Sequence, residues 1–269
     1  MAVYLNKKWG VPINILNKPG GNTIPACLEV HNATPDGYTI LGDGTGSTSQ
    51  LAVVGKNLPF KIMDRTFIAS FFTAPNVLIV YGQSPFKTVE DLVAWAKENP
   101  EKISYASIGG TTGNELTMRQ FFKAIGVDVK KTKPVMVRGG SEIVILVSGG
   151  HAMMGSASTT ATLPSVKGGT VRPLFITSKT RSPLLPDLRT AEEAGYPTLT
   201  TTNWVGVSGP MELSSLIVDK WSEGLREMLN VPEVISQMKN IGGVPFYLDP
   251  QAVKEYIIKD TQSAREYFQ

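Results

Sequence analysis

Residues 105–115 read Tyr-Ala-Ser-Ile-Gly-Gly-Thr-Thr-Gly-Asn-Glu, and two different hydrophobic patterns meet in them. Before the turn, residues 103–107 alternate between apolar and polar side chains and contain strand-forming types. After it, apolar side chains recur at helical spacing over residues 116–125, and Gly126 supplies a stop. The pattern predicts a strand, a glycine-rich turn and the first turn of a helix.

The turn in this stretch has the properties of an anion-binding site. Gly109, Gly110 and Gly113 let the backbone turn tightly and leave room beside it. The first N–H groups of a helix have no partner within the helix and lie at the positive end of its dipole. Thr111 and Thr112 add hydroxyl groups, so an anion can be held without a charged side chain. An ordinary capped strand-to-helix turn explains the same residues equally well, and the local sequence leaves both interpretations open.

Length and composition indicate a globular protein of one large domain or two small ones. Of the 269 residues, 42% are hydrophobic and 18% are charged, which is not the composition of a disordered chain. The net charge of +3 comes from scattered basic residues, so we expect no nucleic-acid partner. The single cysteine, Cys27, excludes an internal disulfide. No apolar run approaches the ~20 residues of a membrane helix, and residues 1–8 lack the apolar core of a secretory signal.

Strand-like and helix-like patterns alternate along most of the chain, which favours parallel sheets with helices on both faces. Such α/β sheets bind ligands beyond the carboxyl ends of their strands. The predicted strands include residues 11–16, 67–72 and 76–81. Loops rich in Gly, Ser and Thr follow four predicted strands, at residues 42–49, 107–114, 138–142 and 155–160.

None of these loops carries an obvious catalytic group. The two histidines, His31 and His151, belong to no Cys or His pair with metal-ligand spacing. The chain has no Gly-x-Ser-x-Gly elbow and no glycine-rich loop with the Lys-Ser/Thr pair of a phosphate site. No general acid and base with an orienting partner emerge. We therefore predict a binding protein with no catalytic residue, metal site or cofactor, rather than an enzyme.

Several motifs, in order along the chain, resemble those of one known family. Residues 17–23 read Asn-Lys-Pro-Gly-Gly-Asn-Thr, and residues 35–41 read Pro-Asp-Gly-Tyr-Thr-Ile-Leu. Further matching segments are residues 75–80, 105–109, 181–187, 190–195, 204–206 and 243–250. On these motifs the chain resembles, nearly from end to end, the substrate-binding receptors of tripartite tricarboxylate transporters. These receptors are the Bug family of bacterial periplasmic proteins.

The resemblance implies an α/β fold, a two-domain periplasmic-binding-protein clamshell of type II-like architecture. Each domain would be a mostly parallel sheet flanked by helices, with the ligand in the cleft between the domains. Domain 1 would comprise residues 1–101 and 228–269, and domain 2 residues 102–227. The family's first strand and its Pro-Gly-Gly loop have no counterpart in this sequence, so domain 1 would be N-terminally incomplete.

The resemblance also implies that the ligand is a small organic carboxylate. One carboxylate group would be held by the loop and helix start that match residues 107–114, with loop 155–160 nearby. The residues expected to bind the ligand are Ser107, Gly109, Gly110, Thr111, Thr112, Gly113, Asn114, Ser156, Ala157, Ser158, Thr159, Thr45, Ser47 and Arg138.

The implied role is that of a periplasmic receptor, expected to be a monomer, which passes its ligand to a membrane permease without transforming it. Dicarboxylates, tricarboxylates, acidic amino acids and aromatic acids all remain open as ligands. The family's usual Tyr-Lys-Gly segment appears as Val137-Arg138-Gly139, and its usual Val-Asp as His151-Ala152. These differences change either the ligand selectivity or only the local packing.

Two other functions remain open at this point. In the first, the receptor is a carboxylate sensor whose closed form contacts a membrane sensor. In the second, the chain is an enzyme with an acyl or nucleotide substrate in the same cleft. The enzyme would need a base near Thr111 or Ser156, and His151 is the only candidate close in sequence.

Overall fold

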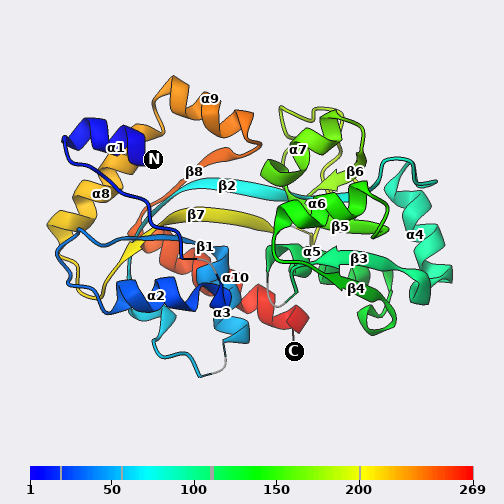
Figure 1. Cartoon of the computed structure of the whole chain (residues 1–269), viewed down its shortest axis with the longest axis horizontal. Helices are drawn as coiled ribbons and strands as arrows, with labels where there is room; N and C mark the ends of the chain where they lie inside the picture. Colours follow the sequence, from blue (N-terminus) through cyan, green and yellow to red (C-terminus); the bar gives the residue numbers. More distant parts are fainter. Residues whose placement is uncertain (19, 56, 110–111, 200, 269) are drawn as a thin grey trace. The chain divides into compact units, whose positions relative to one another are not determined.

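Strand β2, Thr66–Tyr81, has 16 residues and is divided between two compact units of the chain. The computed structural model describes residues 1–18, 20–55, 57–109, 112–199 and 201–268 (Figure 1). Unit 1 consists of Met1–Thr73, Trp204–Lys239 and Val244–Gln269, and unit 2 of Ala74–Asn203 and Asn240–Gly243. The chain therefore changes unit inside β2 and β7 (Thr202–Gly209), and again at the end of α9 (Pro232–Asn240) and just before β8 (Val244–Leu248), whereas the predicted domain boundaries stood at 101/102 and 227/228. Because β2 is continuous, no loop-forming residues mark the point in it where the chain passes from one unit to the other.

Three of the predicted strands differ from the structure. Residues 67–72 and 76–81 are parts of the single strand β2, so the prediction of two strands was wrong. Pro75 lacks only one ladder donor, and the side chains on both sides of it are buried, which keeps the strand continuous. The strand predicted over residues 11–16 does not form, and its Ile15 and Leu16 are 69% and 77% exposed.

In unit 1, β1 (Leu41–Gly44) and β8 each pair antiparallel with a neighbouring strand. β1 pairs with β7 in the register Leu41↔Ser208 to Gly44↔Val205. β7 lies beside β2, and β8 pairs with the first half of β2. The helices of this unit are α1 (Ala2–Trp9), α2 (Ile24–His31), α3 (Ser49–Val54), α8 (Ser215–Met228), most of α9 (Pro232–Asn240) and α10 (Pro250–Phe268).

The core of unit 1 joins segments that are distant in the sequence. Phe67 of β2 and Trp204 of β7 are packed with Cys27 of α2, and with Val253 and Ile257 of α10. The spacing of Val253 and Ile257 by four residues places both on one face of their helix. The last helix is thereby held against a sheet whose first strand lies some 200 residues earlier.

In unit 2 a parallel group of strands lies beside the second half of β2. β3, Ser104–Ser107, is parallel both to β4, Lys133–Met136, and to β5, Met154–Ser158. β2 is antiparallel to β5 and to β6, Val171–Ile176. The α/β fold is confirmed, and the sheets are mixed rather than mostly parallel because β2 runs against its neighbours. The helices of this unit are α4 (Val89–Glu98), α5 (Gly113–Ile125), α6 (Gly140–Ser148) and α7 (Thr159–Lys167).

The two faces of the unit 2 sheet are covered by different helices (Figure 1). Leu78 of β2 packs in one cluster with Met118 and Phe121 of α5. Its neighbour Val77 packs in the other cluster with Ile143 of α6. The alternation follows from the period of two residues in a strand. The same alternation determines which polar side chains of the sheet face α5.

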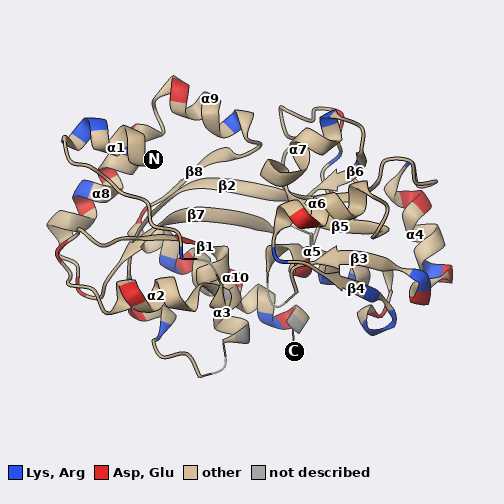
Figure 2. Ribbon diagram, in the orientation of Figure 1, with Lys and Arg blue, Asp and Glu red and all other residues tan. Residues whose placement is uncertain are grey.

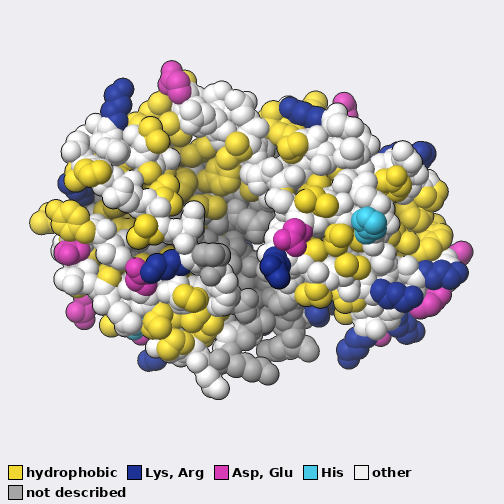
Figure 3. Space-filling model, in the orientation of Figure 1, with side chains coloured by type: hydrophobic (Ala, Val, Ile, Leu, Met, Phe, Trp, Pro, Cys, Tyr) yellow, Lys and Arg dark blue, Asp and Glu magenta, His cyan; other side chains and the backbone are white. Residues whose placement is uncertain are grey.

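Charged side chains of both signs occur on the face that is drawn in Figure 2. The Lys and Arg side chains lie on helices of both units, close to Asp and Glu (Figure 2). In the space-filling view of the same face, charged side chains of both signs lie among hydrophobic ones, and several Lys and Arg lie together at its lower right (Figure 3).

Candidate functional site

The carboxyl ends of three neighbouring parallel strands in unit 2 each lead into a helix. β3 ends at Ser107 before α5, β4 ends at Met136 before α6, and β5 ends at Ser158 directly before α7. The first turns of α6 and α7 are neighbours, because a Cβ placed on Gly140 would lie 3.7 Å from that of Ala161. Three helix N-termini therefore open at one edge of the sheet, where their free N–H groups favour negative charge.

The start of α5 has the local structure that the sequence predicted. The strand–turn–helix order is confirmed, and Gly126, with φ of 75°, ends α5 in the left-handed conformation. Thr112 is the N-cap, and its hydroxyl accepts a hydrogen bond of 3.3 Å from the Glu115 N–H. The N–H groups of Gly113 and Asn114 remain in the unpaired first turn. The predicted ligand residues Gly110 and Thr111 lie outside the described residues.

Ser107, a predicted ligand residue, is buried and already uses its hydroxyl hydrogen. Its Oγ donates to Oε2 of Glu115 at 2.5 Å and accepts the N–H of Gly109 at 2.9 Å. Oε1 of Glu115 accepts from the Tyr105 hydroxyl at 3.3 Å and from Nε of Arg119 at 2.8 Å. Burial, and then the Glu115 carboxylate, raise the pKa of Tyr105 far above its ordinary value, so its hydroxyl stays a donor.

A buried asparagine on β2 holds the first turn of α5. Nδ2 of Asn76 donates to the Gly113 carbonyl at 3.0 Å and to Oγ1 of Thr117 at 2.9 Å. Its Oδ1 accepts from Nδ2 of Asn203 at 2.9 Å, and its N–H donates to Oγ1 of Thr177 at 2.9 Å. Asn76 was not among the predicted site residues, because its only mark in the sequence is that it is a polar residue within an apolar strand pattern.

Residues 155–160 were predicted to form a loop, which is wrong: residues 155–158 belong to β5 and α7 begins at Thr159, and this segment contacts the start of α5. Nδ2 of Asn114 donates to the Ser156 carbonyl at 2.8 Å. Ser156 shares its face of the strand with Met154, which packs with α5, whereas the intervening Gly155 faces Ile143 of α6. The Ser156 hydroxyl is fully buried and has no hydrogen-bond partner among the described residues.

The other predicted residues of this segment are placed differently. Ala157 packs in the apolar cluster on the α6 face. The hydroxyls of Ser158 and Thr160 are 2.7 Å apart and only partly buried. The Thr159 hydroxyl donates to the Gly242 carbonyl within the same unit. Backbone N–H groups of the first turn of α7 are therefore the unpaired donors of this segment.

Arg138 lies at the same edge, between β4 and α6. The N–H of Val137 donates to the Ser107 carbonyl at 2.9 Å, which ties the end of β4 to that of β3. The Arg138 side chain is exposed, and its backbone N–H donates to Oε2 of Glu142 at 3.0 Å. In the part of the chain that the structure describes, no ion pair of its guanidinium is present.

In unit 1, the two predicted residues of loop 42–49 are engaged in the fold. The Ser47 hydroxyl donates to Oδ1 of Asp43 at 2.5 Å, and the N–H of Gly44 donates to the Ser47 Oγ at 3.1 Å. The Thr45 hydroxyl accepts the N–H of Trp204 at 3.0 Å. These bonds connect the loop to β1 and β7 of its own unit.

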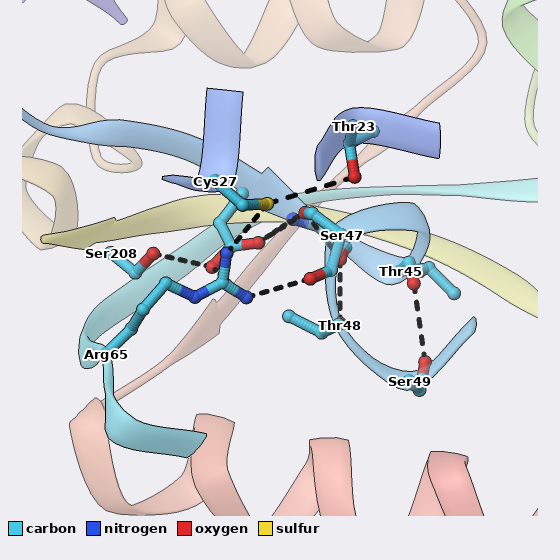
Figure 4. Close-up of polar contacts among 10 residues, drawn as sticks. Thr23, Cys27, Thr45, Ser47, Thr48, Ser49, Arg65 and Ser208 are labelled. Atoms are coloured by element: carbon cyan, nitrogen blue, oxygen red, sulfur yellow. Dashed lines mark hydrogen bonds and ion pairs between the residues drawn. The ribbon is translucent and has the colours of Figure 1, made fainter. Parts of the chain in front are cut away.

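Asp43 belongs to a buried ion pair with Arg65. The Arg65 guanidinium also donates to the Ser47 carbonyl and to Cys27 (Figure 4). Nη2 of Arg65 lies 3.5 Å from Oδ2 of Asp43, and both side chains are inaccessible to solvent. Oδ2 also accepts from the Ser208 hydroxyl at 2.6 Å. Nη1 of Arg65 donates to Sγ of Cys27 at 3.2 Å, and burial raises the pKa of that thiol. The charges are thus compensated inside the core.

The described residues contain no group of three or more His, Cys, Asp or Glu side chains that could hold a metal ion. The ring of His31 lies 5.9 Å from that of Phe60. His151 is exposed and precedes β5, at the opposite end of that strand from Ser158, which leads into α7.

The fold and this edge, rich in uncharged hydrogen-bond donors, define the class of α/β solute-binding proteins. The family model of the tripartite tricarboxylate transporter family receptor matches residues 1–267, and the chain belongs to this family. The family consists of receptors, so the alternative of an enzyme is set aside. Within the described residues, no helix is both long and apolar enough to cross a membrane.

Known relatives share most of their length with this chain. A UPF0065 protein of Bordetella pertussis is 27% identical over 257 residues, which are 95% of this chain and 78% of the relative. The periplasmic binding protein BugD has 25% identity and a TM-score of 0.86, with 99% of this chain and 89% of that one covered. MatC from Rhodopseudomonas palustris with bound malate has 19% identity and a TM-score of 0.85, with 100% and 92% covered. The resemblance to Bug receptors that the sequence motifs indicated is confirmed.

Proposed function

We propose that this receptor binds a small organic carboxylate at the strand-end edge of unit 2 and delivers it to the membrane permease of a tripartite transporter. The observation that carries the proposal is the convergence of the N-termini of α5, α6 and α7 at the ends of β3, β4 and β5. Family membership supports the transport role, and the malate in MatC supports the chemical class.

A carboxylate suits this edge because its donors are unpaired or only partly paired. Among the described residues, the N–H groups of Gly113 and Asn114 in the first turn of α5 have no recorded partner, and the Asn114 side chain reaches the Ser156 carbonyl of β5, the strand that leads into α7. Ser156 supplies a buried hydroxyl without a partner among the described residues. Hydrogen bonds to a charged group contribute about 1.5–3 kcal/mol each, more than neutral ones.

Arg138 is the cation that we assign to a second carboxylate of the ligand. It is exposed beside the start of α6, and a guanidinium binds a carboxylate through two parallel hydrogen bonds. A dicarboxylate would therefore bind more tightly than a monocarboxylate of the same length.

The test is titration calorimetry of the full chain with malate, citrate, glutamate and benzoate. We expect saturable binding of at least one acid at a single site, with the acid recovered unchanged after incubation. If none of the four gives a binding heat while the protein is folded, the proposal is wrong.

We further propose that the receptor works in the periplasm as a monomer. BugD, which is similar over almost the whole chain, is a periplasmic binding protein. Light scattering of the purified protein, with and without the carboxylate that binds, checks the monomer. A stable dimer in both states would contradict it.

A further inference from the structure

Glu115 is an acidic side chain at an unexpected place. It is 3% exposed and lies in the first turn of α5, the helix whose N-terminus we propose as a carboxylate site. Two carboxylates close together in a poorly solvated region repel each other. A buried glutamate at this position therefore needs a structural reason.

The hydrogen bonds around Glu115 supply that reason. Ser107 has one hydroxyl hydrogen. Its Oγ lies 2.5 Å from Oε2 of Glu115 and donates that hydrogen to the carboxylate. The Ser107 oxygen then presents lone pairs only, and it accepts the N–H of Gly109 at 2.9 Å. A neutral group in place of the carboxylate would not enforce this direction, because a hydroxyl can turn to suit its partner.

Gly109, directly after this bond, has a backbone conformation that favours glycine. Its φ of 72° is in the left-handed region, and a Cβ there would collide with Cε of Met136. The bond from its N–H to Ser107 thus fixes the turn just after β3. The hydroxyl of Thr112, the N-cap of α5, donates to the Gly109 carbonyl at 3.2 Å. The position of the helix start therefore depends on the position of Gly109.

The charge of Glu115 is compensated on the side away from this turn. Nε of Arg119 donates to Oε1 at 2.8 Å from one helical turn further along α5. The ion pair reduces the repulsion that the glutamate would exert on an anion at the helix start. The carboxylate can therefore act on Ser107 without excluding a ligand.

We propose that Glu115 is a positioning residue of the ligand site: by taking the Ser107 hydroxyl hydrogen it directs a lone pair of Ser107 at the Gly109 N–H and so sets the position of Gly109 ahead of α5. The ligand is then bound by backbone N–H groups and not by the Ser107 hydroxyl. This inference rests on the proposed function of the same edge, but the positioning step can be measured without any ligand.

The first measurement is amide hydrogen exchange at Gly109 in the ligand-free protein, by NMR. We expect Glu115→Gln and Ser107→Ala each to speed this exchange by about tenfold, the ratio that ~1.4 kcal/mol represents. The double variant should exchange no faster than the single ones, because both remove the same bond. Core amides such as that of Leu78 serve as the internal control for folding. Unchanged exchange at Gly109 in Glu115→Gln overturns the proposal, whatever the effect of Ser107→Ala.

The second measurement is the affinity for malate of the same variants. If Glu115 positions the turn, both single variants weaken binding by a similar factor. If Ser107 instead donates to the ligand, Ser107→Ala weakens binding while Glu115→Gln, which releases the hydroxyl hydrogen, strengthens it, and the inference is wrong. Should the unmodified protein bind none of the tested acids, the proposed function fails, whereas the Gly109 exchange still decides the positioning role.

Discussion

At the residue scale, two serines of predicted ligand loops have opposite surroundings. The Ser47 hydroxyl donates to Asp43 and accepts from Gly44, so it is satisfied by its own loop. The Ser156 hydroxyl is equally buried but unpartnered among the described residues. A buried hydroxyl without a partner costs about 1–3 kcal/mol of stability. Such a hydroxyl is expected where a ligand uses it as a hydrogen-bond partner.

The pair Ser156→Ala and Ser47→Ala separates the two roles. Ser156→Ala should leave the free energy of unfolding unchanged or raise it, and should weaken carboxylate binding by about 1–3 kcal/mol. Ser47→Ala should lower the free energy of unfolding by about 1–3 kcal/mol, because Asp43 and Gly44 each lose a buried partner. Urea unfolding and titration calorimetry measure both quantities. A loss of stability in Ser156→Ala with unaltered affinity would show that its hydroxyl is structural.

At the element scale, α5 is attached to the sheet by a polar side chain at its first turn. Asn76 binds the Gly113 carbonyl and the Thr117 hydroxyl, and Asn203 binds Asn76 in turn. Apolar contacts of Met118 and Phe121 hold the rest of the helix. Hydrogen bonds have preferred directions, whereas apolar packing does not, so Asn76 fixes where the N–H groups of α5 point.

Replacement of this amide by a carboxylate tests the attachment. In Asn76→Asp an oxygen replaces Nδ2 and faces the Gly113 carbonyl, so two acceptors meet in a buried site. We expect the free energy of unfolding to fall by at least the ~1–3 kcal/mol of an unpaired buried group. The same substitution at the exposed Asn6 of α1 is the matched control and should change little. Equal urea midpoints for the two variants would argue against a role of Asn76 in holding α5.

At the scale of the whole molecule, the last helix meets an early one through an acidic side chain. The Ser49 hydroxyl at the start of α3 donates to Oδ2 of Asp260 on α10. Burial raises the pKa of Asp260 above the ordinary 3.8, and the bond from Ser49 only partly opposes this. The folded state therefore holds the Asp260 proton to a higher pH than the unfolded state does.

The sign of the resulting pH dependence follows from proton binding. Between pH 3.8 and the raised pKa the folded state binds more protons, so the Asp260 contribution to stability falls as the pH rises. Asp260→Asn removes this titration and should raise the melting temperature at pH 7 by more than at pH 4. Calorimetry across this range measures the difference, and Asp219→Asn on the exposed face of α8 is the control. A constant difference between the two pH values would contradict the assignment.

Much of the fold was open to prediction from local patterns. The alternation before Ser107, the glycines after it and the helical spacing from Leu116 predicted β3, the turn and α5, since each depends on neighbouring residues. The continuity of β2 was missed because Pro75 is a strong local signal against a strand, and burial on both sides outweighed it. The role of Ser107 in the site was predicted as a direct contact, and its bond to Glu115 now suggests an indirect one.

An α/β receptor with glycine- and hydroxyl-rich strand ends could be predicted from the sequence alone, because turn chemistry, periodicity and family motifs depend on contiguous residues. Which of these polar groups have hydrogen-bond partners became clear from the folded structure. Ser47, Ser107 and Thr159 find partners within the fold, whereas Ser156 does not among the described residues. The reason is that a hydroxyl's partners come from whichever segments pack against it, and no local pattern records those segments.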